Sequence, residues 1–253
     1  MRVIDAQFEP LPKGGILYDA ARIRKPTAAL FTREFWAIRD SLREVPGGRG
    51  SVCFVRPAEL ALPDDDSAWV LRHYRRGGLV AKVLSDRYFW TGASRTRCFR
   101  EWQLLAELHR RGLPVPAPVA AKFERSGCSY RADLITVQLP ASQTLAALLA
   151  RGALAQERWH AIGSTIARFH AQGVQHADLN AHNILLDDAG VVFILDFDRG
   201  RLRESSTSRG KWEDSVLARL RRSLEKVTAS NSAAVFGPEQ WQWLMQGTQV
   251  RLR

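Results

Sequence analysis

The sequence predicts an α+β fold of two lobes within one domain spanning residues 1–253. Two observations predict it. Segments rich in β-branched and aromatic residues fill much of the first half, whereas apolar residues recur at helical spacing through most of the second. Pro140 and the small residues after it punctuate the chain between these regions. We therefore expect a β-rich lobe over residues 1–140 with one key helix, and a mostly helical lobe over residues 141–253.

In the first lobe, strands are predicted at residues 51–55, 69–74 and 134–139, each bounded by turn-forming residues, and residues 79–84 are a candidate for another. From Arg97 the pattern changes to that of a helix, which Gly112 and a series of prolines end. The helix face consists of Phe99, Trp102, Leu105 and Leu108.

In the second lobe, a helix is predicted up to Gly173 from the spacing of Trp159, Ile162, Ile166 and Phe169. Apolar segments at 183–186 and 191–195 flank Asp187-Asp-Ala-Gly190 and predict a β-hairpin. A further helix has basic residues outside an apolar face, and we expect that face to be core rather than membrane-bound. The face consists of Trp212, Val216, Leu220, Leu224 and Val227.

The composition is that of an ordinary globular protein, with 45% hydrophobic and 25% charged residues. Lys and Arg number 37 against 26 Asp and Glu, a formal net charge of +11 that favours polyanionic partners. Three cysteines with no C-x-x-C spacing indicate neither a disulfide framework nor a zinc site. No apolar run approaches a membrane span or a signal peptide, so we expect a cytoplasmic protein that touches a membrane at most peripherally.

The sharpest chemical signal lies around the predicted hairpin. His176-Ala-Asp178-Leu-Asn-Ala-His-Asn183 precedes it, and Asp196-Phe-Asp198 follows its second strand. Phosphoryl transfer needs a carboxylate near the acceptor hydroxyl and oxygen ligands for Mg²⁺. Asp178 suits the first task, and Asn183 and Asp196, at the two ends of a tight hairpin, suit the second. A polar turn beside a core strand is the alternative; we disfavour it because Asp196 and Asp198, inside an apolar segment, are expected to be buried at high cost without a metal.

These motifs resemble the protein-kinase-like superfamily, whose catalytic loop reads H-R-D-x-x-x-x-N and whose metal motif reads D-F-G. The resemblance implies a bilobal kinase-like fold with a nucleotide-binding first lobe and a catalytic, substrate-binding second lobe. It also implies ATP and Mg²⁺ as cofactors, with Asp178 as the catalytic aspartate and Asn183, Asp196 and Asp198 as the metal-binding set. Asp198 has a second possible role, to position Arg199.

The nucleotide-binding residues that the resemblance implies are less regular. Where the superfamily has the lysine of V-A-I-K, Val70-Leu-Arg72-His carries arginine, and Lys82 is the alternative cation for the ATP phosphates. The partner glutamate is expected at Glu101, on the helix after that strand, although a solvent-facing helix glutamate would give the same pattern.

Two backbone segments complete the expected nucleotide site. The glycines of Gly47-Gly-Arg-Gly50, in particular Gly48 and Gly50, fit a loop over phosphates and fit a plain hairpin turn equally well. Gln138 and Leu139 begin the expected connector between the lobes, where adenine would bond to backbone groups.

A longer resemblance covers residues 30–225. Val70-Leu-Arg-His-Tyr-Arg-Arg-Gly-Gly78, Asp86-Arg-Tyr-Phe-Trp-Thr-Gly92 and the catalytic loop are similar to the 3-deoxy-D-manno-octulosonic acid (Kdo) kinases of Gram-negative bacteria, of the lipopolysaccharide kinase group. The resemblance implies transfer of the ATP γ-phosphate to the Kdo 4-hydroxyl of Kdo-lipid A precursor, in lipopolysaccharide inner-core synthesis, by a peripheral enzyme at the cytoplasmic face of the inner membrane. Guanidinium groups suit the anionic substrate, and the candidates beside the site are Arg199, Arg201 and Arg203.

Two other functions fit parts of the sequence. A small-molecule kinase of the aminoglycoside or choline type shares the catalytic pattern, but about 70 residues after the hairpin leave little room for its larger helical substrate lobe. A basic kinase-like scaffold that binds nucleic acid would explain the charge, yet no nucleic-acid-binding motif is found. We therefore expect no nucleic acid and no stable protein partner.

Overall fold

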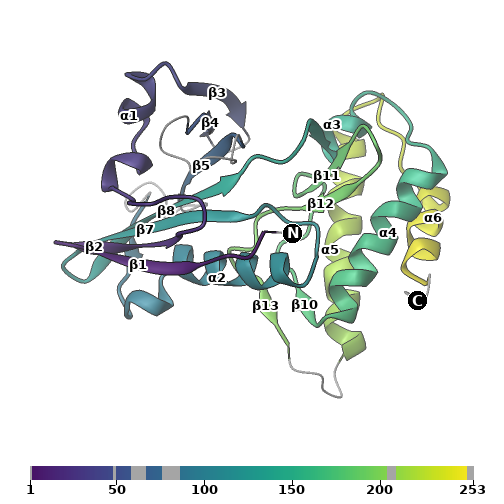
Figure 1. The fold of residues 1–253 in the computed structure, drawn as a ribbon. Helices are drawn as coiled ribbons and strands as arrows, with labels where there is room; N and C mark the ends of the chain where they lie inside the picture. The colour runs from purple at the N-terminus through teal and green to yellow at the C-terminus, as the bar shows by residue number, and fades with distance from the viewer. Residues whose placement is uncertain (1, 48–49, 58–66, 76–85, 204–208, 250–253) are drawn as a thin grey trace. The chain divides into compact units, whose positions relative to one another are not determined.

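The computed structural model describes residues 2–47, 50–57, 67–75, 86–203 and 209–249. The chain forms two compact units: Met1–Gly112 with Pro116–Gln138, and Leu113–Val115 with Leu139–Arg253. Figure 1 shows the strands of the first unit as one twisted sheet and the second unit as helices around a small hairpin. The combination of antiparallel sheet and helices confirms the predicted α+β class.

The strands described in the first unit pair in the order β1-β2-β7-β8-β5-β4-β3, with β6 beside β8, and all pairings are antiparallel. Their bounds are β1 Ala6–Leu11, β2 Gly14–Asp19, β3 Leu42–Gly47, β4 Gly50–Val55, β5 Trp69–His73, β6 Tyr88–Phe89, β7 Pro118–Ser126 and β8 Ser129–Val137. The predicted strands at 51–55 and 69–74 are β4 and β5. The predicted strand at 134–139 is the end of the longer β8, and the candidate at 79–84 lies outside the described residues.

Helix α2, Arg97–Arg110, confirms the predicted helix of this unit and packs on β7 and β8. Its predicted apolar face is buried. Gly112 follows the helix with φ 71°, a left-handed conformation that glycine adopts without strain and that turns the chain away. Short helical segments η1 (Ala28–Phe31), α1 (Arg33–Ala37) and η4 (Ala93–Arg95) complete the unit, and the first two contribute Leu30, Phe31 and Trp36 to a core that includes Trp69.

A polar cluster crosses the middle strands of the sheet. His73 on β5 lies opposite Asp133 on β8, with Nδ1 2.6 Å from Asp133 Oδ1, and the Lys122 ammonium lies 3.2 Å from Asp133 Oδ2. The hydrogen bond that His73 donates to Asp133 raises the pKa of His73, against the opposing effect of burial, and the Asp86 carboxylate, 3.5 Å away, raises it further. The cluster therefore stabilises the folded state most when His73 is protonated.

The raised pKa makes the stability of this unit depend on pH. Because the folded-state pKa of His73 lies above its ordinary value, its contribution is complete below about pH 6.5 and is lost as the pH rises through the raised pKa. Urea unfolding of wild type and His73→Gln, from about pH 6 to 9, should show a difference in unfolding free energy that shrinks as the pH rises. A difference that stays constant or grows would contradict the assignment.

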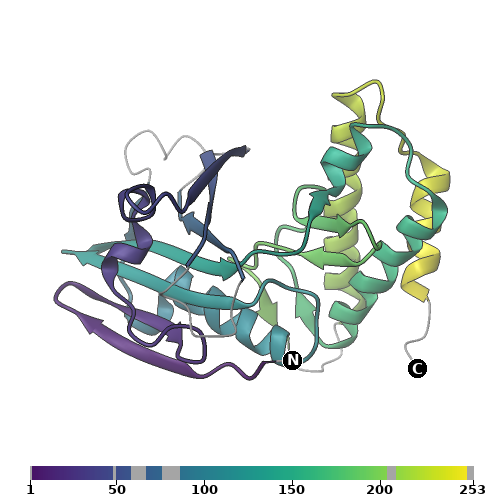
Figure 2. The same ribbon diagram turned by 45° about the horizontal axis from the view of Figure 1, so that its top comes forward.

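The second unit holds a three-stranded sheet, a two-stranded ribbon and the remaining described α-helices. Figure 2 shows the hairpin beside the helices; α4 packs against β12 and α6, and α3 against β11 and α5. The bounds are β9 Ser142–Thr144, α3 Leu145–Leu149, α4 Gln156–Ala171, β10 Val174–Gln175, β11 Ile184–Asp187, β12 Val192–Ile194, β13 Arg201–Leu202, α5 Arg209–Ala229 and α6 Pro238–Gln249. The predicted hairpin and the helix before Gly173 are confirmed as β11–β12 and α4, whereas α6 was not predicted.

The apolar face of α5 belongs to the core of this unit. Trp212, Val216, Leu220 and Leu224 are buried, which confirms the core interpretation of this face over a membrane-bound one. In the described part of the chain, no helix is both long and apolar enough to cross a membrane.

Candidate active site

The loop after β10 is folded around the backbone of Asp178. Its carbonyl oxygen accepts hydrogen bonds from the side-chain amides of Asn180, at 2.9 Å, and Asn183, at 3.0 Å. Asn180 in turn accepts from the backbone amide of His182 at 2.9 Å. Asparagine side chains commonly replace backbone partners in tight turns in this way. The loop is thus held by its own polar side chains, and the exposed carboxylate of Asp178 extends from it.

His176 joins this loop to the segment that carries Asp196. It is buried, with 4% of its surface exposed, and burial lowers its pKa. Nδ1 accepts a hydrogen bond from the backbone amide of Asp178 at 3.1 Å, so Nε2 carries the proton and donates to the Leu195 carbonyl at 2.8 Å. The ring also packs edge-on against Phe197, with centroids 4.8 Å apart. His176 is therefore a neutral imidazole whose two nitrogens both form hydrogen bonds, one to each segment.

The hairpin brings Asn183 and Asp196 to the same end of β11 and β12. Ile184 pairs with Ile194, and one position outward the Leu195 amide donates to the Asn183 carbonyl at 2.9 Å. Asp196 follows directly with φ 62°, a left-handed conformation that is uncommon for residues other than glycine and that often marks a functional turn.

One expectation about this segment is wrong. The side chain of Asp196 is exposed and that of Asp198 is only partly buried, although both lie in an apolar stretch of sequence. The buried member of the motif is Phe197, which stacks on Phe169 with centroids 5.8 Å apart. The left-handed turn at Asp196 ends the strand alternation, so the phenyl ring enters the core and the carboxylate before it faces solvent.

The donor set at this end of the hairpin fits Mg²⁺. This ion prefers one or two carboxylates together with amide, water and phosphate oxygens. Asp196 offers an exposed carboxylate. Asn183 donates through Nδ2 to the Asp178 carbonyl, so its Oδ1 is the atom that could act as a metal ligand.

Helix α5 supplies two contacts to the loop that the sequence did not predict. Arg219 Nη1 lies 2.8 Å from Asp178 Oδ1, and the Ser223 hydroxyl accepts from the Ala181 amide at 3.1 Å. The helical spacing of Leu220 and Leu224 fixes which residues of α5 are buried, but no spacing rule relates Arg219 to a residue 41 positions earlier.

The first unit holds a cation–carboxylate pair in which the carboxylate is buried and the arginine is partly exposed. Arg72 on β5 pairs with Glu101 on α2, and the Tyr74 hydroxyl donates to the same carboxylate oxygen at 2.5 Å. Glu101 is 2% exposed, so it is not the solvent-facing glutamate that was the alternative. Burial, with the Glu101 charge beside it, raises the pKa of Tyr74 well above its ordinary value, which keeps the hydroxyl a donor. Lys82, the alternative cation, lies outside the described residues.

The other predicted nucleotide-binding positions are backbone segments. Gly50 is the first residue of β4, where it pairs with Gly47, and Gly48 lies outside the described residues. Gln138 ends the first unit and Leu139 begins the corresponding segment of the second. The Gln138 amide donates to the Ala68 carbonyl at 2.7 Å, so that donor is already used.

Of the three arginines that follow Asp198, two lie beside β10, the strand that leads into the Asp178 loop. Arg201 belongs to β13, which pairs with β10, and Arg203 Nε donates to Gln175 Oε1 at 2.6 Å. Arg199 lies in the preceding turn and is exposed. The structure thus brings Arg201 and Arg203 to the start of the loop that bears Asp178.

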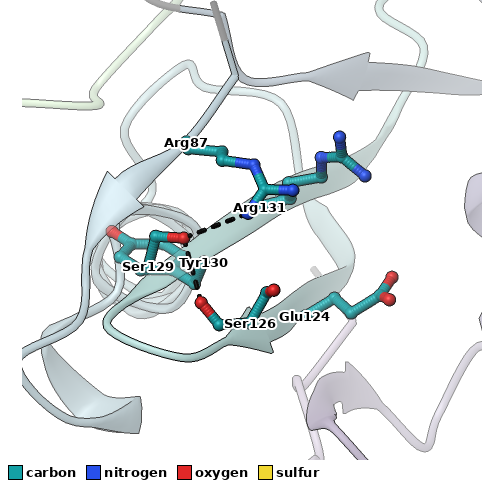
Figure 3. A pocket seen from close by; sticks show the side chains of 6 residues that line it. All are labelled: Arg87, Glu124, Ser126, Ser129, Tyr130 and Arg131. Carbon is teal, nitrogen blue, oxygen red and sulfur yellow. Dashed lines mark hydrogen bonds between the residues drawn. The ribbon is translucent and has the colours of Figure 1, made fainter. Parts of the chain in front are cut away.

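A small polar pocket lies elsewhere, at the turn between β7 and β8. Figure 3 shows Arg87 and Arg131 above Ser129, whose hydroxyl accepts from Arg87 at 3.4 Å. The pocket has a volume of about 20 Å³, which is room for roughly one water molecule and not for a nucleotide or a sugar. This pocket is not a candidate for the phosphoryl-transfer site.

A braced aspartate loop, a hairpin with oxygen ligands at its end and an arginine–glutamate pair between a strand and a helix are together typical of kinase-type phosphotransferases. The model of the lipopolysaccharide kinase (Kdo/WaaP) family matches residues 33–247. The chain is 45% identical over 221 residues to a 3-deoxy-D-manno-octulosonic acid kinase of Xylella fastidiosa (strain 9a5c), covering 87% of this chain and 84% of that protein. It is 46% identical over 223 residues to the kinase of the same name from Xanthomonas euvesicatoria pv. vesicatoria (strain 85-10), covering 87% and 83%.

The chain therefore belongs to the lipopolysaccharide kinase (Kdo/WaaP) family. It is a phosphotransferase that acts on a hydroxyl group of a Kdo-containing or related lipopolysaccharide substrate. Membership in a kinase family implies ATP as the phosphoryl donor.

Proposed function

We propose that this protein transfers the γ-phosphate of ATP to the 4-hydroxyl of Kdo on lipid A precursor, in inner-core lipopolysaccharide synthesis. The observation that carries the proposal is the exposed Asp178 carboxylate, which extends from a loop fixed by three side-chain amide and imidazole contacts to its own backbone. Relatives of nearly half identity, each named a 3-deoxy-D-manno-octulosonic acid kinase, support the choice of sugar.

In this mechanism Asp178 aligns the Kdo hydroxyl and accepts its proton. The hydroxyl oxygen forms a bond to the γ-phosphorus, the bond from that phosphorus to the bridging oxygen of ATP breaks, and ADP leaves. Asn183, Asp196 and Asp198 would hold Mg²⁺, which neutralises charge on the phosphates when bound. His176 keeps the loop and the metal-binding turn in register through Leu195. Most of the rate enhancement in this scheme comes from positioning and electrostatics.

Arg72, held by Glu101, would bind the ATP phosphates in place of the superfamily lysine, and Lys82 is the alternative. Its guanidinium is always charged and offers a planar set of donors suited to phosphate oxygens. Gly48 and Gly50 would cover the phosphates. Adenine would bond to backbone groups of the Gln138–Leu139 connector other than the Gln138 amide.

The substrate would be drawn to the protein by charge. A carboxylated sugar on a phosphorylated lipid is polyanionic, and the chain has a formal net charge of +11. Arg199, Arg201 and Arg203 would contact the substrate carboxylate or phosphate near the catalytic loop. We propose peripheral attachment to the cytoplasmic face of the inner membrane, where such lipid would be presented.

The proposal is tested by transfer of labelled γ-phosphate from Mg·ATP to Kdo-bearing lipid A precursor. The same precursor without Kdo, an aminoglycoside, choline and a generic protein serve as parallel acceptors. Label on the Kdo lipid alone, at the 4-position by mass or NMR analysis, is expected. Label on another acceptor would contradict the assignment of Kdo as the substrate. Binding of polyanions without any phosphate transfer would favour the alternative of a kinase-like scaffold that binds nucleic acid.

The Arg72–Glu101 pair gives a separate prediction. Glu101→Gln keeps the shape of the side chain but removes the charge that holds Arg72, so kcat/KM for ATP should fall by about 10- to 100-fold. Because Glu101 is buried, thermal unfolding should also move to lower temperature. Steady-state kinetics with varied ATP and a melting curve measure both effects.

Glu107→Gln is the matched control for this prediction. Glu107 lies on the same helix and also pairs with arginines, Arg110 and Arg111, but its side chain is 28% exposed and makes no contact with Arg72 among those described. It should leave kcat/KM for ATP within about twofold of wild type. Equal losses in the two variants would show that Glu101 acts only through general stability.

A further inference from the structure

Arg219 contacts the carboxylate on which the proposed chemistry depends. Its Nη1 lies 2.8 Å from Asp178 Oδ1, within the distance of a charge-assisted hydrogen bond. The two side chains are about half exposed, at 49% and 53%, so the pair is open to solvent and to substrate. Surface pairs of this kind contribute about 0–1 kcal/mol to stability. Stability alone is therefore a weak reason for an arginine at this position.

The helix that carries Arg219 is fixed against the catalytic loop. Ser223 lies one helical turn further on, and its hydroxyl accepts a hydrogen bond from the Ala181 backbone amide at 3.1 Å. Two residues on one face of α5 therefore form hydrogen bonds with the same loop. Leu220 and Leu224, next to them in sequence, have no exposed surface. The base of the Arg219 side chain is thus rigid relative to Asp178, as a residue that orients another group requires.

The contact with Arg219 involves one of the two carboxylate oxygens of Asp178. A carboxylate can accept bonds at both oxygens, and Arg219 occupies Oδ1. Oδ2 then remains for the acceptor hydroxyl. The arginine cannot accept the proton of that hydroxyl, because its guanidinium stays protonated in proteins. Its effect on the reaction would come from the orientation of the carboxylate.

We propose that Arg219 is a positioning residue for phosphoryl transfer: it holds Asp178 through Oδ1 so that Oδ2 faces the acceptor hydroxyl. This inference rests on the proposed function of Asp178. It predicts that Arg219→Ala lowers kcat by about 10- to 100-fold while KM for ATP and for the acceptor stay within about twofold. A residue that bound the anionic substrate directly would instead raise the KM of the acceptor.

The experiment compares Arg219→Ala with Arg222→Ala, which removes another exposed arginine from the same helix and should keep wild-type kcat. Arg219→Lys should retain more activity than the alanine variant, and added guanidinium ion should restore part of the activity to Arg219→Ala alone. Melting curves should agree within a few degrees for all variants. Unchanged kcat in Arg219→Ala, or an equal loss in Arg222→Ala, would overturn the proposal.

A double-mutant cycle with Asp178→Asn tests whether Arg219 acts through the aspartate. In that background the further loss from Arg219→Ala should be at most about twofold, because the oriented group is already absent. Independent, multiplicative losses would overturn the positioning role. Failure of the proposed function would look different: wild type and Arg222→Ala would themselves fail to phosphorylate the Kdo acceptor.

Discussion

Replacement of Asp178 by asparagine is expected to lower kcat on the order of 10³-fold, because the acceptor hydroxyl loses the group that aligns it and takes its proton. The backbone contacts of residue 178, to the His176 ring and to the amides of Asn180 and Asn183, do not involve its carboxylate and should survive. The loop should therefore keep its conformation. Single-turnover phosphoryl transfer, with bound ATP measured separately, isolates the chemical step.

Stability gives the control for this substitution. The only described ion pair that is lost is the half-exposed one with Arg219, so the unfolding free energy should change by about 1 kcal/mol or less. Asp188→Asn removes an equal charge from the exposed turn of the hairpin and should retain full activity. Wild-type turnover by folded Asp178→Asn would rule out the assignment of Asp178 as the catalytic aspartate.

Local signals were sufficient for the parts of the fold with a strong period or a strong turn. Helix α2 and the β11–β12 hairpin both contain such signals, and both lie where the sequence predicts them. Strand β7 was missed because its first residue, Pro118, was interpreted only as part of the proline series that ends a helix. Pro118 opens that strand, at the position where a strand tolerates proline. Strands β1 and β2 were missed because they are defined by their pairing with each other, and by that of β2 with β7, as much as by their own composition.

In the candidate site, too, some features follow from local sequence signals and others depend on the three-dimensional fold. The spacing of the catalytic loop and the hairpin predicts which residues meet at the end of β11. It does not predict that Asp196 turns outward, since that depends on one left-handed backbone angle. Arg219 is beyond any spacing argument, because its contact with Asp178 depends on how α5 packs in three dimensions.

The left-handed backbone conformation at Asp196 makes the stability of a variant depend on which residue replaces the aspartate. Its φ of 62° costs alanine about 1–2 kcal/mol, whereas asparagine and glycine accept it readily. Asp196→Asn should therefore melt close to wild type, Asp196→Gly should melt above Asp196→Ala, and only the alanine variant should lose stability. A melting order with alanine at or above glycine would contradict the left-handed turn.

The activity of the Asp196 variants should depend on the negative charge at this position and not on how well the new residue tolerates the left-handed backbone. Without the Asp196 carboxylate, Mg²⁺ would lose one of the two carboxylates proposed to hold it, so Asp196→Asn should lower kcat on the order of 10³-fold and raise the Mg²⁺ concentration needed for half-maximal rate. Glycine and alanine should be equally inactive despite their different melting temperatures. Turnover titrated with Mg²⁺ at fixed ATP measures this, with Asp188→Asn as the charge-matched control. Wild-type Mg²⁺ dependence in Asp196→Asn would show that the ion is held elsewhere, because the asparagine variant keeps the size of the side chain and tolerates the left-handed backbone but lacks the negative charge.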